Sequence, residues 1–439
     1  MKEFLCHFFL VVLLSTQCSG WTLSTSYSSI TMQRIQQSRL SAAKDSFQAP
    51  ASLPTSPLSF TFEELSSYLG GKGRAQACWE MYRLGVDPLW FYNDTMKQEE
   101  ESNYGGLLIS SGWTRERLQF VLKAPIMGTN AIHRLAQLDA PDSITLCLIN
   151  RSNDGTTKLL LKLQDGLEIE TVIIPWEDRQ RSTLCISSQV GCRQACVFCA
   201  TGRMGILRSL TSDEILSQVY WANKVCRVEN ILPVDNIVFM GMGEPADNIP
   251  EVVRAANQLV DRNLFALSGK RVTISTVAPT PQAFADLAQA PVTLAWSVHA
   301  SQDEVRKALV PTSRFSMLEL REGLLSAMKG RSRSLQSIML EVTLLNGIND
   351  NEHDALDLVE FSQPLIAAFP KLLVNLIPWN NIGASSGWAK EFQQPSMERV
   401  SAFQQVLTTH GVLCRIRTTR GDDESSACGQ LATRIKRLK

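Results

Sequence analysis

The 439-residue sequence carries no net charge, because its 43 Lys and Arg residues are matched by 43 Asp and Glu residues. Overall charge therefore neither supports nor excludes nucleic acid as a partner, and only local clusters of basic residues could do so. The 11 cysteines are too few for a disulfide scaffold in a chain of this length. With 44% hydrophobic residues, the chain can bury a large core and form more than one folded unit.

Residues 1–20 lack an apolar run long enough to span a bilayer, since FFLVVLL is too short. This run follows Lys2 and precedes STQCSG, which is the layout of a secretory signal peptide. Residues 21–44 contain no Asp or Glu but are rich in Ser, Thr and Gln and include Arg34 and Arg39, a composition typical of a transit peptide. Pro and Ser then mark a linker that ends near residue 59.

Secretion is the alternative destination, but the cysteines clustered between residues 185 and 199 would be oxidised in a secretory lumen. A signal peptide followed by a transit segment that begins with an aromatic residue, Trp21, resembles the two-part presequence of algae with secondary plastids. We therefore expect the plastid stroma as the location, with the cytoplasm or the mitochondrion as alternatives.

Residues 60–175 are expected to form an accessory unit of helices followed by strands. TFEELSSYL begins with Thr61 and has Glu64 three residues later, the pattern of a capping box, and GRAQACWEMYRLGVDPLW and TRERLQFVLKAP continue the helical spacing. From Ser143 the segments SITLCLI, TKLLLKL and LEIETVIIP predict antiparallel strands, separated by turn-forming residues such as NRSNDGTT.

The rest of the chain alternates between strand and helix patterns. Six strands are predicted at STLCISS, NIVFMG, KRVTIST, PVTLAWSVH, SIMLEVTLL and LLVNLIPW, with helices such as SDEILSQVYWANKV, IPEVVRAANQLVD and MLELREGLLSAMK between them. This order predicts an α/β fold with a parallel sheet and crossover helices, and such sheets bind ligands at the carboxyl ends of their strands. Whether the sheet is open or curled into a barrel cannot be decided from periodicity.

Three cysteines lie within eight residues of GCRQACVFCATGRMG, at Cys192, Cys196 and Cys199. No histidine lies nearby, and only Cys226 and a few distant cysteines could complete the four-ligand set of a zinc site. Three thiolates fit a [4Fe–4S] cluster with one open iron that can chelate a small ligand. A zinc knuckle or ordinary core cysteines are the alternatives.

Two further cysteines stand out by their surroundings. Cys428 follows the charged, small-residue segment RGDDESSACG, which is more typical of a functional loop than of a core, and Cys185 lies in TLCISSQVGC. Thiolates are nucleophiles for alkyl transfer, and two that meet can form a transient disulfide. Burial as small hydrophobic residues is the alternative for each.

The spacing of the three clustered cysteines just after the first strand of an alternating sheet resembles the radical S-adenosylmethionine (SAM) superfamily. TLCISSQVGC with the two later cluster cysteines, FMGMGEP, NLIPWN and TRGDD…ACGQL are together similar to the RNA adenine methyltransferases of the RlmN/Cfr family. The similarity extends over residues 62–431. It implies a partial (β/α)6 radical-SAM barrel at 176–420, an N-terminal helical plus small β accessory RNA-binding domain at 60–175, and a catalytic-cysteine loop and basic tail at 421–439.

The resemblance implies two cofactors, SAM and one [4Fe–4S] cluster held by the three clustered cysteines. It also implies a set of SAM contacts: Gly243, Glu244, Ser275, Ser297, Val298, His299 and Asn380. Taken alone, the glycine-rich GMGEP is more often a turn, and a lone His299 is more often a core residue.

The implied reaction uses SAM twice, because an aromatic C2 carbon is not nucleophilic. Cys428 would take a methyl group from one SAM, a 5′-deoxyadenosyl radical from a second SAM would remove hydrogen from it, and the carbon radical would add to adenine. Cys185 would then resolve the adduct through a disulfide with Cys428, while Glu170 removes the C2 proton. The segment from Glu170 to Cys185 is longer than the usual family spacing, which leaves Glu177 as an alternative base.

The expected activity is methylation of adenosine C2 in 23S ribosomal RNA, at the peptidyl transferase centre, and in tRNA. Methylation at C8, as in the Cfr branch, and a non-catalytic RNA-binding relic are the alternatives. The expected partners are these RNAs and a low-potential electron donor such as ferredoxin or flavodoxin, for a monomer without membrane attachment. A locally basic C-terminal region could contact phosphates or form a solvated tail: Arg415, Arg417, Arg420, Arg434, Lys436, Arg437 and Lys439.

Overall fold

The computed structural model describes residues 56–89, 127–138, 144–383 and 390–433. Residues from Pro54 onward form one compact unit. The signal and transit segments, the helix predicted at 114–125 and the basic residues 434–439 lie outside the described residues.

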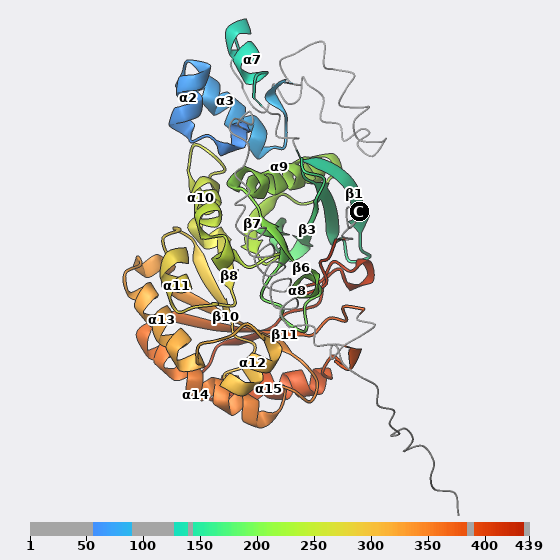
Figure 1. The fold of residues 1–439 in the computed structure, drawn as a ribbon, viewed down its shortest axis with the longest axis vertical. Helices are drawn as coiled ribbons and strands as arrows, with labels where there is room; N and C mark the ends of the chain where they lie inside the picture. The colour runs from blue at the N-terminus through green and yellow to red at the C-terminus, as the bar shows by residue number, and fades with distance from the viewer. Residues whose placement is uncertain (1–55, 90–126, 139–143, 384–389, 434–439) are drawn as a thin grey trace, which may run out of the picture. The chain divides into compact units, whose positions relative to one another are not determined.

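Ten strands form one mixed sheet in the order β1-β2-β3-β4-β7-β8-β9-β10-β11-β12 (Figure 1). β1 to β4 pair antiparallel, and the strands from β4 to β12 pair parallel. Their bounds are β1 Thr145–Arg151, β2 Thr157–Lys162, β3 Glu168–Trp176, β4 Arg181–Cys185, β7 Val234–Phe239, β8 Val272–Thr276, β9 Thr293–Ser297, β10 Ser337–Leu344, β11 Lys371–Pro378 and β12 Cys414–Ile416. All six strands predicted for the barrel are present, so the predicted α/β fold with parallel strands and crossover helices is confirmed.

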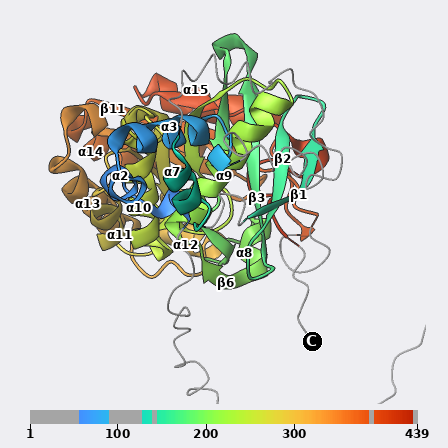
Figure 2. The same ribbon diagram turned by 90° about the horizontal axis from the view of Figure 1, so that it is seen from above.

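Helices connect the parallel strands and cover their outer face (Figures 1 and 2). They are α9 Ser212–Val228, α10 Ile249–Val260, α11 Gln282–Leu287, α12 Asp303–Leu309, α13 Met317–Lys329, α14 Glu352–Ala368 and α15 Met397–Thr409. Burial differs among these strands: every residue of β8 is buried, whereas β4 alternates between half-buried and buried residues and β7 is mostly half-buried.

Two short elements were not predicted. β5 Gln189–Cys192 and β6 Gly205–Ser209 form a separate antiparallel hairpin that encloses the cysteine cluster and the short helix α8 Ala200–Met204. β12 has only three residues. Neither has the length that a recognisable alternation of apolar residues requires.

The expected accessory region begins with α2 Phe62–Leu69 and α3 Lys72–Arg83, followed after an undescribed stretch by α7 Thr129–Leu135. The predicted capping box is present, because the Glu64 carboxylate accepts from the amide of Thr61 at 2.7 Å and the Thr61 hydroxyl accepts from the amide of Glu64. β3 pairs with β4, so the strands of this region continue the barrel sheet. The role of the region in RNA binding stays a prediction.

The chain after α3 passes very close to α9 at Gly85. Gly85 has φ +64°, and a Cβ built there would lie 2.2 Å from the backbone nitrogen of Lys224. Only glycine allows this approach, which docks the first helices against the barrel.

We expect Gly85→Ala to destabilise the protein by about 3 kcal/mol, since it adds both left-handed strain and a backbone clash. Thermal or denaturant unfolding measures this effect. Gly73→Ala is the matched control because a Cβ at Gly73 meets nothing within 4 Å and lies in a helix, where alanine is favoured. Equal stability of the two variants would contradict the close-packed α3–α9 junction.

Candidate active site

A cavity of about 460 Å³ opens at the carboxyl ends of the parallel strands. It brings together most of the predicted site residues: Cys185, Cys192, Cys196, Cys199, Gly243, Glu244, Ser275, Ser297, His299, Asn380 and Cys428. Arg415, Arg417 and Arg420 of the predicted basic region also line it. Val298, Glu170 and the alternative base Glu177 are not among the lining residues.

The three clustered cysteines are presented by the β5–β6 hairpin. Cys192 ends β5, Cys199 precedes α8, and Cys196 lies in the loop between them. The turn is tight: Ala195 has φ 53°, and a Cβ on Gly202 would lie 2.9 Å from the backbone of Cys196. The sequence therefore places small residues where the loop packs against itself.

Burial raises the pKa of all three thiols, to about 12 for Cys196. Among the described residues, no group of three His, Cys, Asp or Glu side chains is arranged around one metal ion. Thiolates that bind an iron–sulfur cluster each hold a different iron and do not converge on one point, whereas zinc ligands do. Three thiols that face one cavity in this way fit a cluster better than a zinc ion.

The GMGEP loop packs directly on β5. Gly243 has φ +101°, and a Cβ there would lie 2.6 Å from Cβ of Gln189, so only glycine fits. The Gln189 side chain accepts a hydrogen bond from the amide of Glu244 at 2.9 Å. Loop and cluster hairpin are thus held together.

The Glu244 carboxylate is buried at the end of the loop. It accepts hydrogen bonds from the amide of Val277 at 3.0 Å, the amide of Ala246 at 2.9 Å and the hydroxyl of Thr276 at 2.5 Å. Burial nevertheless raises its pKa to about 7. A buried carboxylate of this kind is well suited to receive a cationic group such as an ammonium.

Ser275 and Ser297 stand at the ends of the neighbouring strands β8 and β9, with their hydroxyl oxygens 3.1 Å apart. Parallel pairing of β8 with β9 brings these two positions to the same edge of the sheet. They offer adjacent hydroxyl groups to a polar ligand in the cavity.

His299 is fixed as a neutral side chain in the left-handed backbone conformation, with φ 58°. The amide of Thr343 donates to its Nδ1 at 3.2 Å, so the proton of the neutral ring lies on Nε2. Burial and the nearby Arg306 hold the pKa of His299 well below its usual range. Its ring is therefore a hydrogen-bond donor without charge.

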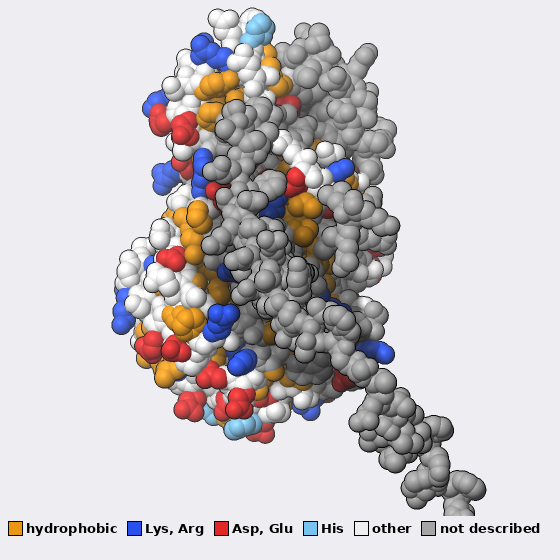
Figure 3. Space-filling view, in the orientation of Figure 1, with side chains coloured by type: hydrophobic (Ala, Val, Ile, Leu, Met, Phe, Trp, Pro, Cys, Tyr) orange, Lys and Arg blue, Asp and Glu red, His pale blue; other side chains and the backbone are white. Residues whose placement is uncertain are grey.

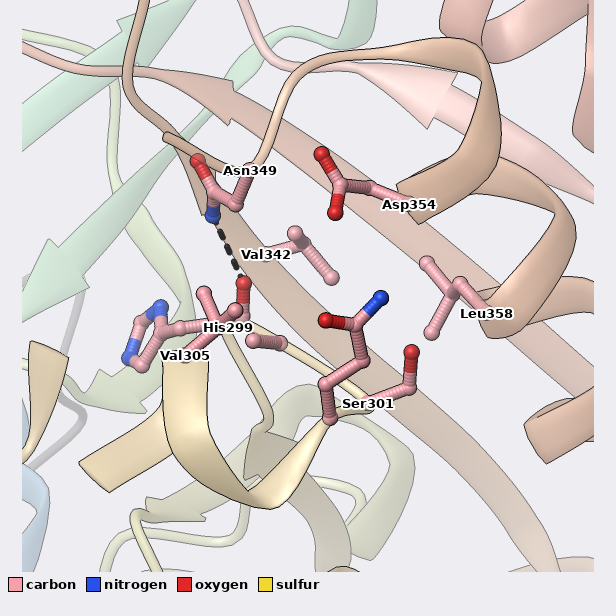
Figure 4. Close-up of a pocket in the computed structure, with 9 residues that line it drawn as sticks. His299, Ser301, Val305, Val342, Asn349, Asp354 and Leu358 are labelled. Carbon is pink, nitrogen blue, oxygen red and sulfur yellow. Dashed lines mark hydrogen bonds between the residues drawn. The ribbon is translucent and has the colours of Figure 1, made fainter. Parts of the chain in front are cut away.

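The backbone of His299 is held from behind by Asn349, whose amide donates to the His299 carbonyl at 2.7 Å (Figure 4). Figure 4 shows the imidazole pointing away from the small hollow beside Asn349 and Asp354. That hollow has about 10 Å³, space for one water at most. The hollow is therefore too small for a ligand, and the residues around it serve to hold the His299 backbone.

Val298 is fully buried and contributes its backbone rather than a side chain. Its carbonyl accepts from Arg306 at 2.6 Å, as do the carbonyls of Ser297 at 2.6 Å and Val277 at 2.5 Å. Arg306 is 1% exposed and makes no ion pair with a carboxylate among the described residues; its positive charge lies near Cys196 and Glu244. No pattern in the sequence predicts a role for Arg306.

The loop that carries Cys428 is bound to the cluster hairpin by its backbone. The amide of Ala200 donates to the Gly429 carbonyl at 2.7 Å, and the Thr201 hydroxyl donates to the Leu431 carbonyl at 2.5 Å. Asn380 donates from its side-chain amide to the Cys428 carbonyl at 3.0 Å. The predicted contact residue Asn380 thus positions the loop as well as lining the cavity.

The same loop is bound on its other side to β2 and the β1–β2 turn, as the red segment beside the green strands of Figure 1 shows. Asp154 accepts from the amide of Gly421 at 3.0 Å and pairs with Arg420 at 3.4 Å. Lys158 donates to the carbonyls of Glu424 at 3.0 Å and Ser425 at 3.1 Å.

Glu170, the predicted base, lies on β3 and faces the segment just past Cys428. Its carboxylate pairs with Lys158 at 3.1 Å and accepts from the amide of Ala432 at 2.8 Å. Burial raises its pKa, although Lys158 acts in the opposite direction. Glu177 lies in the exposed 3-10 turn η4 Glu177–Arg179.

The charge of Arg417 acts on both Cys185 and Cys428, the two cysteines predicted to be reactive. It lowers the pKa of both Cys185 and Cys428, although burial has the larger effect and raises both, that of Cys185 to about 12. Arg417 pairs with the buried Glu341 at 3.3 Å, and Glu341 accepts from Asn375 at 2.7 Å. Glu341, in the middle of an apolar strand, was not predicted as a site residue.

Comparisons with known proteins place this site in context. Residues 186–359 match the radical SAM superfamily. The dual-specificity RNA methyltransferase RlmN of Syntrophotalea carbinolica is 36% identical over 377 residues, covering 86% of this chain and 89% of that protein. RlmN of Marinobacter nauticus is 39% identical over 293 residues, covering 65% of this chain and 74% of that protein.

Among solved structures, a radical SAM methyltransferase from Sphaerobacter thermophilus superposes with a TM-score of 0.65 at 31% identity, covering 86% of this chain and 99% of that one. None of the described helices has the length and apolar character needed to cross a bilayer.

Arg306→Met is expected to destabilise the fold by about 3 kcal/mol, because it leaves three buried carbonyls without a donor. The midpoint of denaturant unfolding measures this loss. Lys307→Met is the matched control, since the neighbouring Lys307 is exposed. An Arg306→Met protein as stable as the control would contradict the anchoring role.

The Asp154 contacts predict that acid loosens the Cys428 loop. Although burial raises it, hydrogen bonds from Thr156 and Gly421 hold the pKa of Asp154 below its ordinary 3.8. The contact therefore stabilises the loop above about pH 4 and is lost as the pH falls through the lowered value. Hydrogen exchange of residues 418–433 should rise in this range, and Asp154→Asn should show the loosened state already at pH 7.

Asp178→Asn serves as the control for Asp154→Asn, because Asp178 is exposed and pairs only with Arg179 among the ion pairs of the described residues. If hydrogen exchange of residues 418–433 is unchanged in Asp154→Asn, the Asp154 contacts do not hold the Cys428 loop in place.

Proposed function

Because the chain belongs to the RlmN family of radical SAM RNA methyltransferases, we propose that it methylates C2 of an adenosine in 23S ribosomal RNA and in tRNA. The enzyme uses a [4Fe–4S] cluster and SAM, as its superfamily does. One observation supports methylation at C2 by this mechanism. Cys185 and Cys428 are 243 positions apart in the sequence, yet both line the cavity that the three clustered cysteines also line.

Cys192, Cys196 and Cys199 would hold the cluster, and the buried Glu244 with the neighbouring hydroxyls of Ser275 and Ser297 would bind SAM beside it. Together the bound cofactors supply a 5′-deoxyadenosyl radical, which can remove a hydrogen atom from an unactivated methyl group. The cavity holds this chemistry away from bulk solvent on the side formed by His299 and Asn380.

Cys428 would be the methyl carrier. Its thiolate attacks the methyl carbon of SAM, the new C–S bond forms as the bond to the sulfonium sulfur breaks, and S-adenosylhomocysteine leaves. Burial in the cavity raises the pKa of Cys428, and the positive charge of Arg417 acts against this by favouring the thiolate that the step needs.

Cys185 would release the product. Its thiolate attacks the Cys428 sulfur of the covalent RNA adduct, so an S–S bond forms as the C–S bond breaks. Before this attack, the adduct formed by the carbon radical would lose the C2 proton and one electron, which the electron-transfer partner takes up. The carbon then leaves with the electron pair and takes a proton to become the methyl group on the base, and an external dithiol would reduce the disulfide for the next turnover. Glu170 supports this region through the Ala432 amide, and removal of the C2 proton is the role we propose for it.

The distribution of charge favours RNA entry from the cavity side. Acidic side chains gather over the helices at the lower end of the face in Figure 3, where α12 begins with Asp303 and Glu304 and α14 contains Glu352 and Asp354. Arg415, Arg417 and Arg420 instead line the cavity. Phosphates are thus attracted to the site and repelled from this helical end.

We further propose that the first 59 residues direct a monomeric enzyme to a plastid, where ferredoxin or flavodoxin supplies electrons. The support is the signal-like run and the absence of acidic residues from 21 to 44. A fluorescent protein fused to residues 1–59 and expressed in plastid-bearing algal cells tests the destination. Fluorescence that stays in the cytoplasm would contradict the proposal.

Cys428→Ala should abolish methylation, because no sulfur remains to carry the methyl group. Cys185→Ala should instead accumulate RNA covalently bound to Cys428, since the adduct cannot be resolved. Mass spectrometry of the protein detects the methyl thioether or the adduct, and nucleoside analysis distinguishes 2-methyladenosine from the 8-methyl isomer.

Cys147→Ala is the control, because Cys147 is an exposed cysteine of β1 that is not among the cavity residues. If Cys428→Ala still methylates RNA, the proposed mechanism is wrong. An 8-methyladenosine product would show that the enzyme methylates C8 instead of C2.

A further inference from the structure

Trp176 is the last residue of β3 and stands at the boundary of two hollows. It lines the catalytic cavity and also a second hollow of about 670 Å³ that runs along the inner face of the sheet. The ring is half-buried, and its indole N–H donates to the Thr183 hydroxyl at 3.1 Å, which fixes its orientation. No step of the proposed reaction explains why a tryptophan occupies this position.

Two arginines lie against this indole ring. The guanidinium carbon of Arg420 is 5.3 Å and that of Arg179 is 5.4 Å from the ring centroid. Arg420 is fixed by the Pro175 carbonyl at 2.8 Å and by Asp154 at 3.4 Å. Trp176 and Arg420 therefore form a rigid pair.

Arg179 is held much less firmly. Its side chain is 49% exposed, and its ion pair is with the adjacent, exposed Asp178 at 3.4 Å. A planar ligand can lie on the Arg179 guanidinium, or take its place on the indole, without breaking a buried interaction.

The short connection between β3 and β4 presents Arg179. Its 3-10 turn η4 is followed by Gln180 in the left-handed conformation with φ 50°, and β4 begins at Arg181. This turn brings the Arg179 cation back over Trp176 at the end of β3.

The second hollow continues from this point and carries several basic side chains among polar and apolar ones. It shares Trp176, Arg179, Arg415 and Arg417 with the cavity and adds further cations: Arg181, Lys270, Arg271 and Lys371. Glu341 is its acidic lining residue, and Asp235 pairs with Arg181 at 3.3 Å and Arg271 at 3.6 Å. The exposed Lys270 and Lys371 leave positive charge for phosphates.

We propose that Trp176, with Arg179 and Arg420, is a stacking platform for an unpaired nucleobase adjacent to the target adenosine. The proposal rests on the proposed function, because it assumes an RNA whose target base enters the cavity. Aromatic rings and guanidinium planes stack on bases that are splayed out of a helix, whatever the base sequence. The basic hollow then receives the backbone beyond the stacked base.

The test is a double-mutant cycle that combines protein variants with RNA variants and measures binding affinity. It uses the reconstituted full-length enzyme under anaerobic conditions. The RNA is a hairpin with an unpaired target adenosine, compared with two versions in which the nucleotide before or after the target is abasic. Trp176→Ala should weaken binding of the intact hairpin about 10-fold, the size expected for one stacked base. It should weaken one of the abasic hairpins by no more than about 2-fold, because the partner of the ring is already missing.

Trp176→Phe should retain most of the affinity, and Arg179→Ala, a change at an exposed side chain that leaves the fold intact, should lose part of the base-dependent affinity. Lys270→Gln is the matched control: as a phosphate contact, it should weaken all three hairpins equally and reduce the salt dependence. Equal effects of Trp176→Ala and Arg179→Ala on intact and abasic RNA would overturn the platform. So would wild-type affinity that is indifferent to both abasic sites.

Failure of the proposed function gives a different result. Nucleoside analysis of the wild-type reaction on the intact hairpin reports C2 methylation independently of the binding cycle. A wild-type enzyme that binds in a base-dependent way but makes no 2-methyladenosine in ribosomal RNA or tRNA would refute the function and leave the platform standing.

Discussion

The site depends on a backbone contact between two segments that are far apart in the chain. The amide of Ala200, at the start of α8, donates to the carbonyl of Gly429, next to the proposed methyl carrier. Together with the Thr201 bond to Leu431 and the Asn380 bond to the Cys428 carbonyl, this contact fixes the Cys428 segment relative to the clustered cysteines. Backbone groups suit this task because their positions do not depend on side-chain rotamers.

Charge inside the cavity is arranged with few compensating ion pairs. Arg306 is buried on carbonyl oxygens, His299 is kept neutral by an amide donor at Nδ1, and Glu244 is held by three donors. Buried charges are favourable only when they are paired. A ligand with an ammonium group and a carboxylate, bound beside an anionic cluster, would supply complementary groups.

Much of this arrangement follows from patterns that the sequence displays. The six barrel strands are apolar runs with helices between them, and the site residues of the cavity stand at strand ends, as at Ser297 and Asn380. The β5–β6 hairpin and β12 were missed because they are too short to show a period. These elements are formed by long-range pairing rather than by local preference.

The site side chains that the sequence did not predict were missed for a different reason. Arg306 and Glu341 occur in ordinary helical and strand patterns, and only the fold shows that they point inward. For Val298 and Glu170 the sequence supplied the position but not the orientation: Val298 acts through its carbonyl, and Glu170 faces the chain beyond Cys428. Orientation depends on twist and register, which a single sequence does not specify.

The two ends of the strand order meet in the loop after β12. That loop leaves β12 at one edge of the sheet and binds the β1–β2 turn at the other, through Asn153 to Asp423 and Gly421 to Asp154. One segment therefore both closes the open side of the barrel and carries the proposed nucleophile Cys428. Because it is attached at both edges of the sheet, a change in its length would strain the two attachments at once.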